Sequence, residues 1–272
     1  MLFAVSGLMD CQVHASDGEV GAVKDFLFDD RSWKIRWIEV ETGHWLPDRR
    51  VLIHPSAVAP LSLPRKPALP MMSPGQAVEL AVDLTKAQIE AGPQAQADEP
   101  VTRQMESLLY DYYGWDAYWG VTHFGAAALS HSELKIVPEA EQRDADAETF
   151  SLGDVSGLRS VGSVKGAHVH ALDGDIGHVE NLLADDSNWE IRYLVIATRN
   201  WWPGKVVQLS PYAVKDADWS DRRVNVNVTR EQVKSAPAWD PLALADQASE
   251  EALHRHFGWP GYGGSAKRQE NA

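Results

Sequence analysis

Two pairs of adjacent aspartates are the residues whose type and spacing could most directly do chemistry. Asp29-Asp30 and Asp185-Asp186 could hold a cation, or could divide the roles of general acid and general base. Calcium-like cations take six or more oxygen ligands from several positions, and the neighbouring sequence offers no such set. Serine or asparagine follows each pair, and these side chains favour turns because they bond to nearby backbone. We therefore expect both pairs to be turn residues.

Histidine spacing raises the question of a metal site. His168 and His170 lie two apart on an expected strand, so they face the same way, and His178 follows a turn later. That spacing can hold a metal ion. A first copy of this stretch, described below, keeps only His14 in register and has Gln12 in place of His168. We therefore expect no metal-binding residue here.

Other reactive constellations are missing from the sequence. Cys11 is the only cysteine, and Ala167 stands in its place in the second copy, which favours a small buried side chain over a reactive thiol. His254 and His256 lie two apart on an expected helix and so point in different directions. The sequence contains no nucleophile elbow, P-loop, GxGxxG or HExxH motif. We expect no catalytic or cofactor-binding residue and no enzymatic activity.

Tryptophan is the outlier of the composition, with 11 residues. Several recur as pairs, such as Trp33 with Trp189, and duplicated tryptophans are expected in the core or between two packed units. The turn 199–205 has basic ends and an additional tryptophan where the first copy has Leu46. Aromatic and arginine side chains are favoured binding anchors, so this turn either packs internally or docks a partner. The candidate partner-binding residues are Arg199, Trp201, Trp202, Lys205 and Trp45.

The elements that must position these residues are written twice. Residues 14–58 align without a gap with residues 170–214, at an offset of 156, and 19 of 45 positions are identical. Segment 79–93 is echoed by 225–237. Chance does not produce such a match, so we interpret the chain as an internal duplication.

Each copy is predicted to be mostly β-strand. Asp-Gly pairs at 17–18 and 173–174 indicate tight hairpin turns between apolar runs. Strands are expected at 20–28, 33–40, 51–54 and 77–83, with counterparts in the second copy. In the strand expected at 33–40, Trp33, Ile35 and Trp37 are expected on one face, and Trp189, Ile191, Tyr193 and Val195 on the matching face of the second copy.

Helices are expected to be short and late in each copy. Thr85 with Gln88, and Thr229 with Gln232, form the capping-box pattern that begins a helix. A second helix in each copy, within 106–115 and 250–259, is expected to end at a left-handed glycine, Gly114 or Gly258.

Composition and the repeat together suggest the domain boundaries. We expect a first unit at 1–119, an acidic linker at 120–156, a second unit at 157–264 and a disordered tail at 265–272. The net charge of −14 argues against direct contact with nucleic acid or anionic lipid. We expect no membrane span and no signal peptide, and a single cysteine fits a cytoplasmic location.

The stretch from Gly21 to Val58, with its G-x-V-x-D-x-L-F-D-D-x-S-W core, resembles the PRC-barrel family. This family includes the cytoplasmic domain of the photosynthetic reaction-centre H subunit and the C-terminal domain of small-subunit ribosome maturation factors. The resemblance covers about 1–80 and 157–230. It implies a mainly β fold of two small, SH3-like, six-stranded barrels with short helices, which we expect to be arranged as a pseudo-dimer. The family docks onto partners and has no common catalytic motif.

The leading functional hypothesis is a non-enzymatic docking or adaptor module that binds a protein partner, without cofactor. The alternatives are a ribosome- or RNA-processing-associated factor, and a photosynthetic complex assembly factor. The sequence shows neither the transmembrane helix of the H subunit nor the RNA-handling domain of the maturation factors, so neither role transfers whole. Homo-oligomerisation of the chain stays open.

Overall fold

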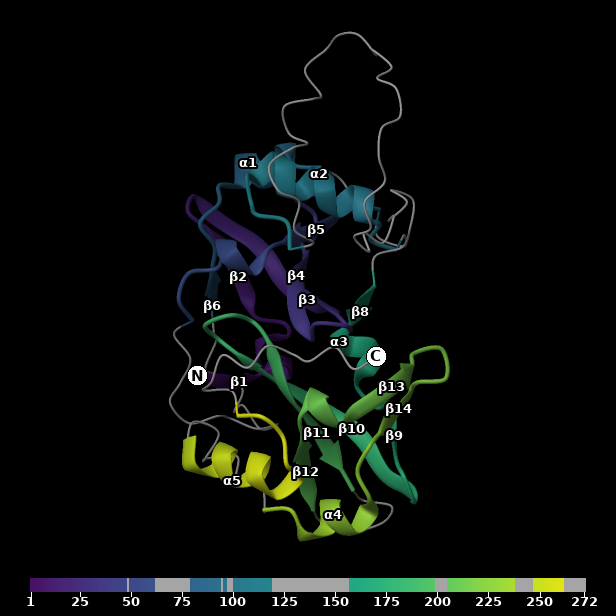
Figure 1. Ribbon diagram of the computed structural model, residues 1–272. Helices are drawn as coiled ribbons and strands as arrows, with labels where there is room; N and C mark the ends of the chain where they lie inside the picture. Colours follow the sequence, from purple (N-terminus) through teal and green to yellow (C-terminus); the bar gives the residue numbers. More distant parts are fainter. Residues whose placement is uncertain are drawn as a thin grey trace, which may run out of the picture.

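The chain forms two β-rich units that are stacked one above the other (Figure 1). The computed structural model describes residues 1–47, 49–61, 79–93, 95–96, 100–118, 157–198, 205–237 and 247–261. The expected mainly β class with short helices is confirmed by two seven-stranded sheets. The expected linker 120–156 and tail 265–272 lie outside the described residues.

The first sheet has the strand order β6-β2-β3-β4-β5-β7. A hairpin at Asp17-Gly18 joins β2 to β3, as the sequence predicts. Its strands are β2 (Gln12–Ala15), β3 (Gly18–Asp29), β4 (Lys34–Glu41), β5 (Arg49–Ile53), β6 (Glu79–Ala81) and β7 (Ala95–Gln96).

The second sheet repeats this order as β12-β11-β10-β9-β14, followed by β13. The parallel pairing of β2 with β6 in the first sheet returns as the parallel pairing of β9 with β14. Its strands are β9 (His168–Ala171), β10 (Gly174–Asp185), β11 (Ile191–Ala197), β12 (Val206–Leu209), β13 (Val214–Asp218) and β14 (Arg223–Val226).

Short helices cover the far ends of both units (Figure 1). They are α1 (Lys86–Ala91) and α2 (Arg103–Tyr113) in the first unit, and α4 (Arg230–Ser235) and α5 (Gln247–Phe257) in the second. Both predicted capping boxes are present at Thr85 and Thr229. Gly114 and Gly258 have φ of 68° and 74°, which confirms the predicted left-handed helix ends.

Each unit lends a short strand to the sheet of the other. Strand β1 (Leu2–Ala4) pairs antiparallel with β10, and β8 (Leu158–Ser160) pairs antiparallel with β3. Adding 156 to Leu2 and to Asp29 gives Leu158 and Asp185, and the structure pairs Leu2 with Asp185 and Asp29 with Leu158. The exchange is therefore reciprocal and keeps the same register on both sides.

The units also touch directly at the tips of β4 and β11. Lys34 and Glu190 form an antiparallel bridge, with a hydrogen bond from the Ile35 amide on one side of it. At the same place the ring of Trp189 from the second unit packs 6.3 Å from that of Phe26 in the first, measured between centroids. The largest cluster of buried apolar side chains draws on both units, so the hydrophobic core is continuous across the junction.

A β-bulge overturns the predicted facing of β4. Strand β3 pairs Leu27 with Trp37 and Phe28 with Ile35, so Arg36 is an extra residue on β4. Ile35 therefore packs into the core shared by the units, whereas Trp37 packs with Leu27 in a separate cluster against α2. The prediction that Trp33, Ile35 and Trp37 share one face is wrong.

The same bulge recurs in β11. Leu183 pairs with Tyr193 and Ala184 with Ile191, which leaves Arg192 as the extra residue. Ile191 lies in the shared core, while Tyr193 packs against α5 with Leu183. The predicted common face of Trp189, Ile191 and Tyr193 is wrong for the same reason.

The region of the chain that the structure describes contains no helix long and apolar enough to cross a membrane.

Candidate docking site at the junction of the two units

Two pockets open at the junction, and they occupy equivalent positions in the duplicated fold. We call them the Trp33 pocket and the Trp189 pocket after the buried tryptophan in each. Residues 30–33 of the first unit and 211–219 of the second line the Trp33 pocket. The Trp189 pocket is built the other way round, from residues 186–189 and 54–61. Both buried tryptophans have positive φ, 56° for Trp33 and 60° for Trp189.

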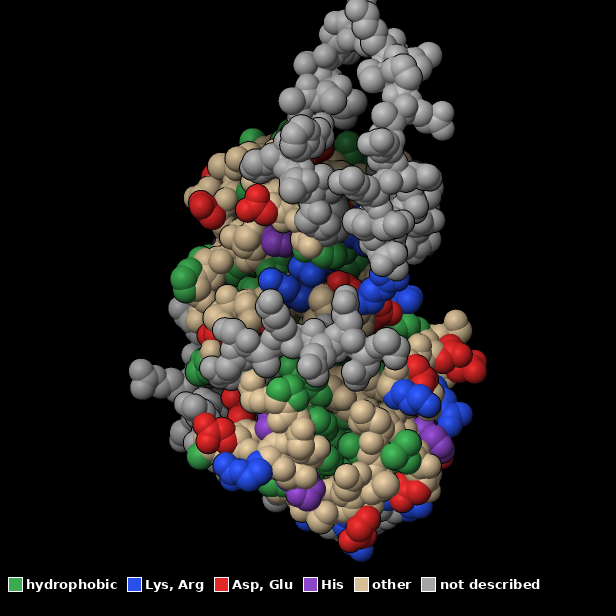
Figure 2. Space-filling view, viewed as in Figure 1, with side chains coloured by type: hydrophobic (Ala, Val, Ile, Leu, Met, Phe, Trp, Pro, Cys, Tyr) green, Lys and Arg blue, Asp and Glu red, His purple; other side chains and the backbone are tan. Residues whose placement is uncertain are grey.

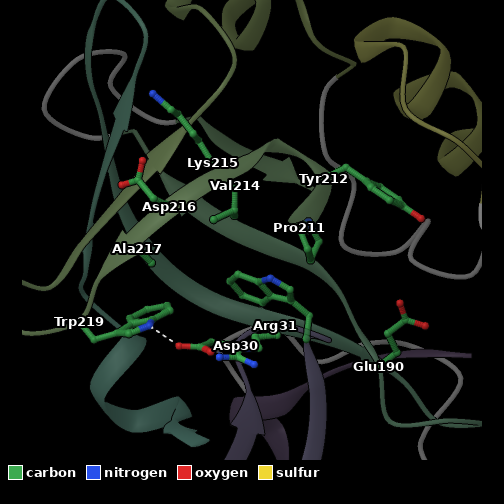
Figure 3. Close-up of a pocket in the computed structure, with 11 residues that line it drawn as sticks. Asp30, Arg31, Glu190, Pro211, Tyr212, Val214, Lys215, Asp216, Ala217 and Trp219 are labelled. Atoms are coloured by element: carbon green, nitrogen blue, oxygen red, sulfur yellow. Dashed lines mark hydrogen bonds between the residues drawn. The ribbon is translucent and has the colours of Figure 1, made fainter. Parts of the chain in front are cut away.

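The Trp33 pocket has a volume of about 290 Å³, and apolar and aromatic groups form much of its wall. Figure 3 shows Pro211, Val214 and Trp219 around its interior, with the Lys215 side chain directed outward at the rim. Its residues are Asp30, Arg31, Trp33, Glu190, Pro211, Tyr212, Val214, Lys215, Asp216, Ala217 and Trp219. The charged residues are of both signs, so the pocket offers aromatic contacts beside polar and charged groups.

Asp30 fixes one wall of this pocket. Its Oδ2 atom accepts hydrogen bonds from the indole Nε1 of Trp219 at 2.8 Å and from Nε of Arg159 at 2.7 Å (Figure 3 draws the first). Both donors belong to the second unit, whereas Asp30 belongs to the first. The Trp219 ring also meets Phe28 edge to face, with centroids 6.2 Å apart. The wall is therefore held by contacts across the junction.

The Trp189 pocket has a volume of about 540 Å³ and a different rim. Lys34 and Asp186 supply charges of opposite sign there, and His54, Ser56, Ser187 and Asn188 supply neutral polar groups. Lys34 and Ala59 of the Trp189 pocket hold the positions that Glu190 and Lys215 hold in the Trp33 pocket. The two pockets thus share an equivalent buried tryptophan and differ in the charged and polar residues around it.

His54 is a neutral residue of the Trp189 pocket. Burial, with smaller contributions from Arg36 and Lys34, lowers its pKa to about 4. Its Nδ1 atom accepts a hydrogen bond from the Ser56 amide at 3.2 Å, so the proton of the neutral ring is on Nε2. This bond also caps the 3₁₀ turn Pro55–Ala57, in which Pro55 holds the first position. A histidine that loses its proton near pH 4 is a weak base at neutral pH.

Two equivalent glutamates, one under each sheet, were not singled out by sequence reasoning; the first is buried and the second is partly exposed. Glu106 of α2 is fully buried, and it accepts hydrogen bonds from Nε1 of Trp37 at 2.9 Å and from Nη1 of Arg103 at 3.1 Å. Burial nevertheless raises its pKa to about 6. In the second unit the Tyr193 hydroxyl donates to Glu250 at 3.0 Å. Both glutamates open the matched segments 106–115 and 250–259, which is the signal that could have revealed them.

The residues predicted to bind a partner are not gathered into one site. Arg199, Trp201 and Trp202 lie outside the described residues. Trp45 is half-buried against the core, with Nζ of Lys86 4.3 Å from its ring centroid. Lys205 accepts a hydrogen bond through its carbonyl from the Thr198 hydroxyl, at 2.8 Å. Trp45 and Lys205 belong to equivalent loops of different units, so the structure does not bring them together.

The paired aspartates act as turn residues, as predicted. Asp29 accepts hydrogen bonds from the Arg31 amide and the Ser32 hydroxyl, and Asp185 accepts them from the amide and the hydroxyl of Ser187. Asp30 has the additional role across the junction described above, which the sequence did not indicate. Cys11 is half-buried, and burial raises the pKa of its thiol.

The candidate metal histidines lie on one hairpin. His168 and His178 are direct partners across β9 and β10, and Nδ1 of His170 lies 2.7 Å from Oδ1 of Asp175. Among the described residues, no group of three or more histidine, cysteine or acidic side chains is arranged to hold a metal ion.

Charge on the surface is mixed. On the face drawn in Figure 2, lysine and arginine side chains gather around the middle of the molecule, and acidic side chains are scattered over both units.

No protein-family model matches the chain, and no curated protein matches it either. The PRC-barrel resemblance therefore stays a hypothesis, supported by the residues quoted for it.

Proposed function

We propose that this protein is a non-enzymatic docking module made of two PRC-type barrels, and that a partner protein binds it at the Trp33 pocket. One observation carries the proposal. The junction presents a concave aromatic surface, with Tyr212 and Trp219 half-buried beside the buried Trp33. Aromatic side chains in concave patches are the commonest anchors of protein interfaces.

The wall of the pocket supports binding rather than catalysis. Asp30 is engaged by Trp219 and Arg159, so its role is to hold the surface in shape. The carboxyl group of Glu106 and the imidazole of His54, whose pKa values are strongly displaced, lie elsewhere. Glu106 is buried beneath α2, and His54 belongs to the Trp189 pocket and is a weak base. A partner side chain with an aromatic or aliphatic body and a polar tip fits the Trp33 pocket best, since aromatic rings lie there beside charged groups of both signs.

Site-specific photo-crosslinking in the native host tests this proposal. The photoreactive residue benzoylphenylalanine replaces Lys215 at the rim, and the matched control replaces Lys234, an exposed lysine of α4. We expect the Lys215 position to capture a defined protein that the Lys234 position does not, and excess unmodified protein to compete with the capture. Equal capture at both positions, or no protein captured at Lys215, would contradict the proposal. Capture of ribosomal proteins would instead favour the ribosome-associated alternative.

A further inference from the structure

The main chain of the junction is the same on both sides. The Ile35 amide donates to the Trp189 carbonyl at 2.9 Å, and the Ile191 amide donates to the Trp33 carbonyl at 2.7 Å. Adding 156 to the residue numbers of the first unit converts one of these bonds into the other, and the same relation links the pairings of β1 and β8. The backbone alone would therefore let a unit pair with a second copy of itself as readily as with the other unit.

The side chains at the centre of the junction break this equivalence. Lys34 and Glu190 are direct backbone partners in the bridge on the axis that relates the units, so residues of opposite charge stand opposite each other there, and Glu190 acts electrostatically on the Lys34 ammonium. Pairing of like units would set Lys34 against Lys34, or Glu190 against Glu190. Like charges directly opposite each other on paired strands are destabilising. Arg36 lies close enough to act on the Lys34 ammonium, which would add to the repulsion between two first units.

A second contact discriminates in the same direction. Arg159 of β8 is bonded to Asp30, with the Asp30 side chain 19% exposed. Subtracting 156 shows that Phe3 of β1 holds the position of Arg159. Two first units paired through the same register would place Phe3 beside Asp30 and remove the arginine from it. The cation left for Asp30 would be the Met1 ammonium, which bonds the equivalent Asp186 in the structure.

We infer that the junction is selective, with each unit binding the opposite unit and rejecting its own kind, so that the tandem closes on itself. The selection has a consequence for assembly. A tandem whose units paired like with like would use its first unit on one neighbour and its second unit on another, and such contacts build open-ended filaments. Opposite charges at the axis prevent this by weakening the wrong pairs as well as strengthening the right one.

Charge reversal in the full-length chain tests the inference. The variants are Lys34→Glu, Glu190→Lys and the double swap. Each is unfolded and refolded at several protein concentrations, and its molar mass is measured by light scattering after gel filtration. Either single reversal sets like charges opposite each other at the central bridge in every pairing, correct or incorrect. We expect the single variants to form concentration-dependent oligomers and to lose on the order of 4 °C in unfolding temperature. The double swap should restore both the monomer and the wild-type melting temperature.

Two control variants, Lys234→Glu and Glu231→Lys, change the net charge equally on exposed positions of α4 and should leave assembly unchanged. If a single reversal prevents folding altogether, recovery by the double swap still supports selection. Effects of the two single changes that simply add in the double swap would overturn it, as would single variants that refold to wild-type monomers. None of these outcomes depends on whether the Trp33 pocket binds a partner.

Discussion

At the scale of single residues, His54 and Glu106 give the first unit two opposing responses to pH. The folded pKa of His54, about 4, lies below the ordinary value of 6.5. Its contribution to stability is therefore complete above pH 6.5 and is lost as the pH falls towards 4. The folded pKa of Glu106, about 6, lies above the ordinary 4.5. Its contribution is complete below pH 4.5 and is lost as the pH rises through 6.

Replacing His54 should remove the first of these responses. The variant His54→Asn keeps a side chain that can cap the turn but cannot titrate. A shift from 6.5 to 4 corresponds to about 3 kcal/mol, so wild-type protein should lose up to that much more unfolding free energy than the variant between pH 7 and pH 4. Urea unfolding at several pH values measures the difference. Ser210→Asn at the equivalent cap is the control, and parallel pH curves for His54→Asn and wild type would refute the burial of the ring.

Residue roles that depend on neighbours in sequence could be predicted, and those that depend on distant contacts could not. Asp29 and Asp185 bond to amides and hydroxyls two or three positions away, so their turn role is visible in the sequence. Asp30 meets Trp219 only because two units come together. Glu106 is buried because α2 lies against the sheet, and a lone glutamate in a helical segment normally indicates an exposed face.

At the scale of elements, the hairpins and the helix caps could be predicted because their chemistry is local. The bulges at Arg36 and Arg192 could not. Apolar residues stand on both sides of each bulge, so an extra residue leaves the alternating pattern looking intact. Strands β1 and β8 were also missed, since three residues are too few to show a pattern and their partners are more than 100 residues away.

A further bulge in each sheet depends on a glycine. Gly21 has a φ of 156° and Gly177 a φ of 143°, and a Cβ added to either would lie 2.0 Å from the carbonyl oxygen of Glu41 or Ala197. We expect Gly177→Ala to lower the unfolding free energy by more than about 2 kcal/mol, because backbone must move. Gly43→Ala is the control, since it also has positive φ but no atom within 4 Å of the added carbon. Equal effects in thermal or chemical unfolding would show that the close approach is absent.

At the scale of the whole molecule, duplication was readable from the sequence, and mutual exchange of strands was not. The repeat of 14–58 in 170–214 predicts two similar folds and leaves their arrangement undetermined. The structure adds that each sheet is completed by a strand from the other unit, above and below a shared core. A partner that binds the Trp33 pocket would therefore contact both units at once, and its site would exist only while the units stay together.

Scalar couplings across hydrogen bonds, measured by NMR on the deuterated full-length protein, test the interlocked arrangement most directly. Cross-peaks should link the Ile35 nitrogen with the Trp189 carbonyl carbon, and the Ile191 nitrogen with the Trp33 carbonyl carbon. Within one unit, the bonds from Val23 to Cys11 and from Val179 to Ala167, at 2.9 and 2.8 Å, are matched references. Reference cross-peaks of normal intensity with both junction cross-peaks missing would contradict the joined units, and the observation of all four would establish them.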